Sequence, residues 1–157
     1  MSDTSRIELN ITSNARSLPV VRSAVERMAR LEGFGDADAH ALVLAIDEAL
    51  ANVIEHGYGG AADQPIGIVL ASVRSTDGRL GIEVSVRDQG RQVDPDSIVG
   101  RDLGEVRPGG LGVHIIRSVM DEVEYRQGEG GGMLLRMVKY VGSGGSTTDR
   151  PTTLSGS

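Results

Sequence analysis

The stretch Leu42 to Gly60, with the sequence LVLAIDEALANVIEHGYGG, decides the fold. Its apolar side chains recur at helical spacing, and Glu48 and Asn52 lie one turn apart on the opposite side. The pattern predicts an amphipathic helix that stops at the closing glycines. Two interpretations of the acid and the amide stay open. In the first, they border a covered pocket, because the earlier turns on their side carry Ala41, Leu44 and Ala45. In the second, they belong to an ordinary solvated helix face.

The composition bounds the class of protein. A chain of 157 residues with 39% hydrophobic residues is long enough for one domain with its own core, which we place at residues 1–141. The net charge of −6 argues against direct binding of nucleic acid or of an anionic membrane, so proteins and small molecules are the expected partners. The absence of cysteine and of a membrane-spanning apolar run predicts a cytoplasmic protein.

Periodicity predicts the remaining elements. Helical spacing occurs twice more, and period-two alternation or short apolar runs bounded by turn residues occur five times. Asp36 or Asp38 is expected to cap the helix that carries Glu48. The residues from 142 to 157 have no apolar period and predict a disordered tail rich in Gly, Ser and Thr. The predicted strands are 6–11, 66–73, 80–86, 123–127 and 133–140, and the further helices are 18–31 and 113–120.

The segment from Arg87 to Gly112 is a long loop rich in Gly, Asp and Arg, and loops of this length inside a compact domain are usually functional or disordered. Its last residues, Gly109-Gly110-Leu111-Gly112, lie directly before a predicted helix. Glycines at a helix start let unpaired N–H groups approach an anion, so this is a candidate phosphate site. A plain turn between loop and helix is the alternative.

Three features occur in a fixed order: Glu48 with Asn52 on a helix, Asp88-x-Gly90 after a strand, and the glycines before the last helix. In that order and spacing they resemble the sequence boxes of the GHKL ATPase superfamily, which includes gyrase and the histidine kinases. The phrases AIDEALANVIEHGY, DQGRQVDP and GGLGVHIIRSVMDEVEY resemble the anti-sigma serine-protein kinases of bacterial partner-switching systems. The resemblance extends over Ile7 to Tyr140. It implies an α/β (α+β) two-layer sandwich, with a mixed, mostly antiparallel sheet covered on one face by helices.

The resemblance also implies ATP and Mg²⁺ as cofactors and assigns roles to the first two features. Asn52 would hold the magnesium ion, because an amide oxygen is a suitable hard ligand. Glu48 would be the catalytic residue that orients the incoming hydroxyl or acts as its base. Asp88 would accept a hydrogen bond from the adenine amino group, and Gly90 would leave room for the ring.

The third feature is assigned to the phosphates in the same way. The backbone of Gly110, Leu111 and Gly112 would lie along the triphosphate under a lid that spans roughly residues 92–108. One departure from the family pattern matters here. Gln92 stands where the family usually has a second glycine, which puts the fit of adenine and the hinge of the lid in doubt.

The function that the resemblance implies is an ATP-dependent serine/threonine protein kinase and anti-sigma regulator. Its substrate would be a small anti-sigma-factor antagonist of the STAS type, a sigma factor is a candidate second partner, and a homodimer is a candidate assembly. The alternative is a nucleotide-binding regulatory module that acts only by binding partner proteins. Retention of Glu48 and Asn52 favours the kinase, whereas Gln92 leaves the question open.

Overall fold

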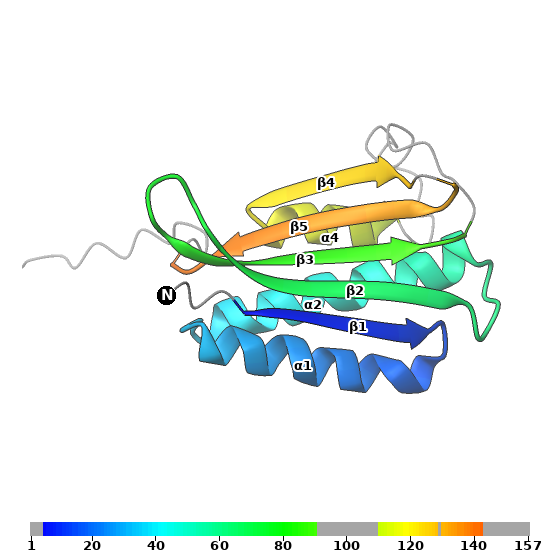
Figure 1. Ribbon diagram of the computed structural model, residues 1–157, viewed down its shortest axis with the longest axis horizontal. Coiled ribbons are helices and arrows are strands. Elements are labelled where there is room, and N and C mark those ends of the chain that lie inside the picture. The colour runs from blue at the N-terminus through cyan, green and yellow to red at the C-terminus, as the bar shows by residue number, and fades with distance from the viewer. Residues whose placement is uncertain (1–4, 91–109, 129, 143–157) are drawn as a thin grey trace, which may run out of the picture.

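The computed structural model describes residues 5–90, 110–128 and 130–142. In this part of the chain, a five-stranded sheet carries three α-helices on one face (Figure 1). The predicted two-layer α/β architecture is therefore confirmed. In chain order the elements are β1 (Arg6–Thr12), α1 (Leu18–Leu31), α2 (Asp36–Asn52), β2 (Pro65–Arg74), β3 (Leu80–Asp88), α4 (Gly110–Val119), β4 (Glu122–Gln127) and β5 (Met133–Tyr140).

The strand order is β1-β2-β3-β5-β4, and every pairing among the described strands is antiparallel. The described sheet is thus wholly antiparallel, whereas the resemblance implies a mixed, mostly antiparallel sheet. Two pairs of consecutive strands form antiparallel hairpins, β2 with β3 and β4 with β5. Because β3 is the central strand and Asp88 is its last residue, opposite Ile66 of β2, this aspartate lies at one end of the middle of the sheet.

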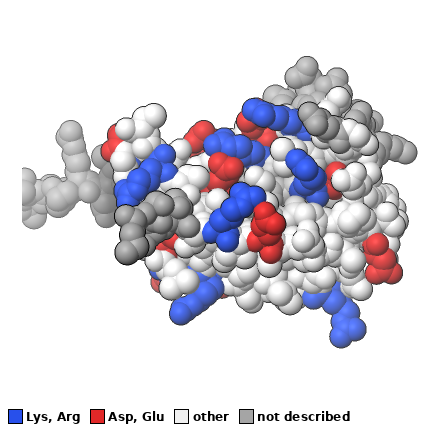
Figure 2. Space-filling view, in the orientation of Figure 1, with Lys and Arg blue, Asp and Glu red and all other residues white. Residues whose placement is uncertain are grey.

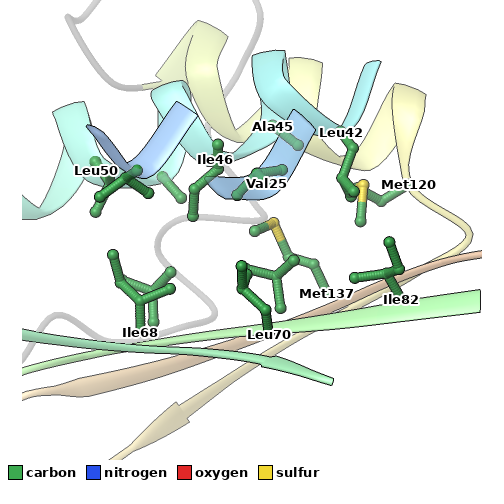
Figure 3. Packing of buried hydrophobic residues seen from close by; sticks show 14 of the residues in the cluster. Val25, Leu42, Ala45, Ile46, Leu50, Ile68, Leu70, Ile82, Met120 and Met137 are labelled. Carbon is green, nitrogen blue, oxygen red and sulfur yellow. The ribbon is translucent and has the colours of Figure 1, made fainter. Parts of the chain in front are cut away.

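The core lies between the sheet and the helices. In Figure 3, side chains of α1 and α2, with Met120 after α4, face Ile68, Leu70, Ile82 and Met137 of the strands. α2 is the central helix, since it packs against both α1 and α4. Ala45, which the sequence pattern puts on the open side of α2, is fully buried for this reason. The exposed side of α2 is therefore narrower than the exposed side of an ordinary amphipathic surface helix.

The helix starts differ from the sequence prediction. Gly35 is the N-cap of α2 and makes no side-chain cap, while the carboxylate of Asp36 is bound to Arg30 of α1. Asp38 lies inside α2, with its carboxylate 3.8 Å from the ammonium group of Lys139. An aspartate whose carboxylate binds a cation elsewhere does not cap the helix, so both capping predictions were wrong. α4 also begins earlier than predicted, at Gly110.

The end of α2 is the most unusual local feature. The regular α-helix stops at Asn52 and continues as a π-helical turn over Val53–Gly57, whereas the sequence predicts one uniform helix up to the glycines. A π turn adds a residue to the helical repeat and is common at functional sites. It widens the end of the helix beside Glu48 and Asn52.

The second face of the sheet carries polar side chains. Arg136 of β5 binds Glu83 of β3 over 3.0 Å and approaches Glu122 of β4 at 3.6 Å. In the view of Figure 2, positive and negative side chains are interspersed with wide uncharged areas. None of the helices in the described part of the chain is long and apolar enough to cross a membrane.

Candidate functional site

Glu48 and Asn52 lie on the last two turns of α2 and are both half-buried. Neither side chain has a hydrogen-bond or ion-pair partner among the described residues. Their neighbour Asp47 differs, because its carboxylate accepts a hydrogen bond from Arg22 of α1 over 2.6 Å. No described residue therefore competes with a ligand for the acid or the amide, while the adjacent aspartate holds two helices together.

Asp88 is the most deeply buried carboxyl group described here, with 4% of its surface exposed. Burial raises its pKa above the usual value, and the backbone N–H groups of Gly90 and Met133 counter that shift in part. The Gly90 N–H donates to the carboxylate over 2.9 Å. A partly satisfied, desolvated carboxylate can gain much from a further donor, which is a suitable property for a group that binds an amino group.

Two glycines allow the chain to pack tightly around Asp88. A Cβ on Gly90 would lie 2.3 Å from the carbonyl oxygen of Gly57, in the π turn. A Cβ on Gly132, before β5, would lie 1.9 Å from the backbone oxygen of Asp88, and its φ of +77° also favours glycine. The space beside Gly90 is thus filled by the protein itself. The structure gives this glycine a packing role, and its predicted place beside the adenine ring stays a prediction.

The π turn lies directly against Asp88. A Cβ on Gly57 would be 3.6 Å from the carboxylate oxygen Oδ1, which is ordinary contact. The next residue, Tyr58, accepts a hydrogen bond from the Gln89 N–H over 2.7 Å with its hydroxyl group. The same hydroxyl donates to the carbonyl oxygen of Pro65. The end of α2 and the end of β3 are consequently joined by direct contacts.

The first turn of α4 belongs to the same end of the molecule. Lys139 binds the carbonyl oxygen of Val119 at the end of α4 and lies close to Asp38 near the start of α2, so the two helices run in opposite directions. The N-terminus of α4 therefore lies toward the C-terminus of α2 (Figure 1). Gly110, Leu111 and Gly112 form the first turn of this helix. The predicted lid and Gln92 lie outside the described residues.

Sequence reasoning missed the residues that join these elements. Gly57, Tyr58 and Gly132 were not singled out as parts of the site, because each acts through a contact with a residue far along the chain. The tyrosine stands inside the phrase EHGYGG, which gave only a helix-stop signal. The glycines on either side of the tyrosine, Gly57 and Gly59, were a signal, because they indicate a compact turn.

The residues present fit a nucleotide and its cation in part. Among the described residues, no group of three or more His, Asp or Glu side chains is placed to hold a metal ion. The amide oxygen of Asn52, which no described residue binds, suits magnesium as a single protein ligand, since this ion keeps several waters and phosphate oxygens around it. The α4 N-terminus offers backbone N–H groups of the kind that bind phosphate.

Comparison with known proteins shows the family to which the chain belongs. Residues 11–139 match the histidine kinase-like ATPase domain family, so the chain belongs to this family of ATP-binding domains. A serine-protein kinase RsbW of Bacillus velezensis is 31% identical in an alignment that covers 94% of this chain and 92% of that protein. RsbW of Halalkalibacterium halodurans is 27% identical over 143 residues, covering 86% and 83%. Within the ATPase family, the chain belongs to these serine-protein kinases.

Two solved structures share the fold. The RsbU and RsbW domains of a Mycobacterium tuberculosis protein align with a TM-score of 0.58 and 21% identity, covering 86% of this chain and 32% of that longer chain. The SiaB-SiaC complex from Pseudomonas aeruginosa aligns with a TM-score of 0.51 and 13% identity, covering 86% and 89%. At these identities the likeness concerns the fold alone.

Proposed function

We propose that this kinase transfers the γ-phosphate of ATP to a serine or threonine of a small anti-sigma-factor antagonist of the STAS type. The observation that supports the proposal most is the position of Glu48 and Asn52. Their side chains, which bind no other described residue, lie on the final turns of α2, at the same end of the molecule as the buried Asp88. A nucleotide that reaches from Asp88 toward α4 would bring its phosphates near the acid and the amide.

Each group would bind a different part of the nucleotide. The Asp88 carboxylate accepts a hydrogen bond from the adenine amino group, which supplies the donor that burial makes favourable. The first turn of α4, with Gly110, Leu111 and Gly112, receives phosphate oxygens on its N–H groups. Asn52 holds Mg²⁺ through its amide oxygen. When bound, the ion neutralises charge on the phosphates.

Glu48 would act on the acceptor hydroxyl. The hydroxyl oxygen forms a bond to the γ-phosphorus, while the bond from that phosphorus to the β–γ bridging oxygen breaks and ADP leaves. The hydroxyl proton passes to the Glu48 carboxylate. Because phosphoryl transfer involves little early proton movement, the carboxylate mainly aligns the hydroxyl, and such a base contributes about 10² to 10⁴ in rate.

The choice of protein substrate rests on the family. The relatives named serine-protein kinase RsbW support a protein acceptor, and the resemblance to partner-switching kinases narrows it to a STAS-type antagonist. Binding of a sigma factor by the same protein, as part of one regulatory cycle, is included in the proposal, as is a homodimer. A binding module without catalysis is the competing function.

The test compares Glu48→Gln with Glu55→Gln, which changes an exposed carboxylate on the π turn. We expect Glu48→Gln to bind MgATP normally and to transfer phosphate to the cognate antagonist at least about a hundredfold more slowly. Glu55→Gln should keep the wild-type rate, and Asn52→Ala should lose metal-dependent ATP binding. Wild-type transfer by Glu48→Gln would refute the role of Glu48. Absence of transfer by the wild-type protein to any antagonist would favour the binding module.

A further inference from the structure

Tyr58 occupies a special position at the end of the β2–β3 ladder. The last pair in this ladder is Ile66 opposite Asp88, so the next residues that would face each other are Pro65 and Gln89. The tyrosine hydroxyl stands between them, accepting from the Gln89 N–H over 2.7 Å and donating to the Pro65 carbonyl. Since proline has no N–H, Pro65 and Gln89 could form only one direct bond, from the Gln89 N–H to the Pro65 carbonyl oxygen. The hydroxyl replaces it and keeps the two strand ends apart.

The backbone of Tyr58 belongs to the end of α2. Its N–H donates to the carbonyl oxygen of Val53 over 2.9 Å, which closes the π turn that follows Asn52. The main chain of this residue is therefore fixed to the helix that carries Asn52, while its hydroxyl is fixed to the strand that carries Asp88. One side chain spans the gap between the two proposed ends of the nucleotide site.

The loop of residues 59–64, between Tyr58 and β2, is held by other hydrogen bonds. The hydroxyl of the buried Ser13 donates to the carbonyl oxygen of Ala61 over 2.6 Å and accepts from the Gln64 N–H over 3.0 Å. The Ser13 N–H also donates to the carbonyl oxygen of Gln64 over 2.8 Å. These bonds fix the loop to the end of β1. Loss of the Tyr58 hydroxyl would consequently leave the loop in place and release mainly the residues after Asp88.

We propose that Tyr58 is a positioning residue, which fixes the Asp88 carboxylate relative to Asn52 and so sets the affinity and selectivity for adenine nucleotides. The inference rests on the proposed contact of Asp88 with the adenine amino group. Tyr58→Phe keeps the ring and removes the hydroxyl, which leaves the Gln89 N–H and the Pro65 carbonyl to pair directly. The Asp88–Gly90 turn then shifts toward β2, while Asn52 stays on α2.

The test measures binding and kinetics with ATP and with purine riboside triphosphate, which lacks the 6-amino group. The wild-type protein should prefer ATP by about tenfold or more, as expected for a hydrogen bond to a carboxylate. In Tyr58→Phe we expect the Kd for ATP to rise about fivefold to thirtyfold and the preference for ATP to fall at least about threefold. The KM for ATP should rise while kcat changes less than about twofold.

Tyr140→Phe is the matched control. It removes a hydroxyl that donates to Glu122, and Tyr140 pairs with Gly81 at the opposite end of the sheet from Asp88. This variant should keep both the affinity and the preference. A wild-type protein that does not distinguish the two nucleotides would refute the Asp88 contact and the inference with it. Discrimination that is present in the wild type and fully retained in Tyr58→Phe would refute the role of Tyr58 alone.

Amide hydrogen exchange of the wild-type protein supplies a second test, which does not depend on folding of the variant. The Gln89 amide should exchange slowly, because its N–H is bound to the tyrosine hydroxyl. Addition of ADP should increase protection of the Gln89 and Tyr58 amides together, since the side chain joins their segments. Fast exchange at Gln89, or protection of only one of the two amides by ADP, would overturn the inference.

Discussion

The carbonyl oxygen of Gly57 lies where a side chain on Gly90 would have to be, because an ideal Cβ on Gly90 would approach it to 2.3 Å. The contact joins the π turn after α2 to the turn after β3. The backbones of two segments separated by more than thirty residues thus touch directly, with no side chain between them. The close approach explains why glycine is required at position 90 before any ligand is considered.

Gly90→Ala is therefore expected to destabilise the protein. The methyl group meets backbone atoms, which cannot move away like the end of a flexible side chain, so we expect a loss of about 1–3 kcal/mol in the free energy of unfolding. Gly67→Ala in β2 is the control, since the nearest atom to its Cβ would be 3.9 Å away. Urea unfolding would measure both. Equal stability of the two variants would contradict the packing role of Gly90.

We expect Asp88→Asn to change the free energy of unfolding in a pH-dependent way and, as a separate effect, to weaken ATP binding. The pKa of Asp88 is raised by burial, so the folded protein holds this proton more tightly than the unfolded chain, and ionisation at neutral pH lowers stability. The wild type regains that stability as the pH falls from 7 through the raised pKa toward 3.8, the ordinary value, whereas Asp88→Asn does not. The unfolding free energy of the variant minus that of the wild type should therefore decrease with falling pH.

Thermal unfolding measured from pH 7 to below pH 3.8 would show this difference, with Asp36→Asn as a control of opposite sign. Arg30 lowers the pKa of Asp36, so its ion pair stabilises the protein at neutral pH and is lost as the pH falls below 3.8. This effect should be small, because the pair is exposed. At pH 7, calorimetry should show that Asp88→Asn binds ATP about ten- to a hundredfold more weakly. A pH-independent stability difference would contradict the burial argument.

Lys139 and Asp38 should be more strongly coupled than their separation suggests. Their charged atoms are 3.8 Å apart, but the side chains are only 4% and 17% exposed, and the ammonium group also donates to the Val119 carbonyl over 2.8 Å. We expect a double-mutant cycle with Lys139→Met and Asp38→Asn to give a coupling of about 1–3 kcal/mol.

Arg22 and Asp47 are the comparison pair for that cycle. They are closer, at 2.6 Å, but their side chains are 43% and 31% exposed, so solvent screens their attraction. A cycle with Arg22→Gln and Asp47→Asn should give about 0.2–1 kcal/mol. A larger coupling in this exposed pair than in the buried pair would show that distance outweighs burial here.

The regular elements could be predicted from sequence because each one carries its own periodic pattern. The alternation at 6–11 and the helical spacing at 18–31 correspond to β1 and α1 almost to the residue. Asp88 was placed at a strand end by the same reasoning, and the structure has it as the last residue of β3. Its partner strand β2 lies just before it in the chain, across the turn at Asp77-Gly78.

The contacts that assemble the site could not be predicted in this way, because they join residues without any fixed spacing. Nothing in the sequence places Tyr58 beside Gln89, or Lys139 beside Asp38. The cap of α2 was missed for a related reason. A cap prediction considers only local bonds, and the carboxylate of Asp36 binds a guanidinium from the preceding helix instead.

Because of the π turn over Val53–Gly57, the number of residues between Asn52 and Tyr58 cannot change without moving the residues that follow. Removing one residue from the turn would restore an ordinary helical repeat, and each following residue would rotate by about 100° around the helix axis. Gly57 would then leave Asp88, and the tyrosine hydroxyl would leave the strand ends. The tip of the β2–β3 hairpin lies at the other end of the sheet, and its hydrogen bonds join residues of the turn itself. Variation in length among functional variants should therefore be tolerated at the hairpin tip and excluded from the turn.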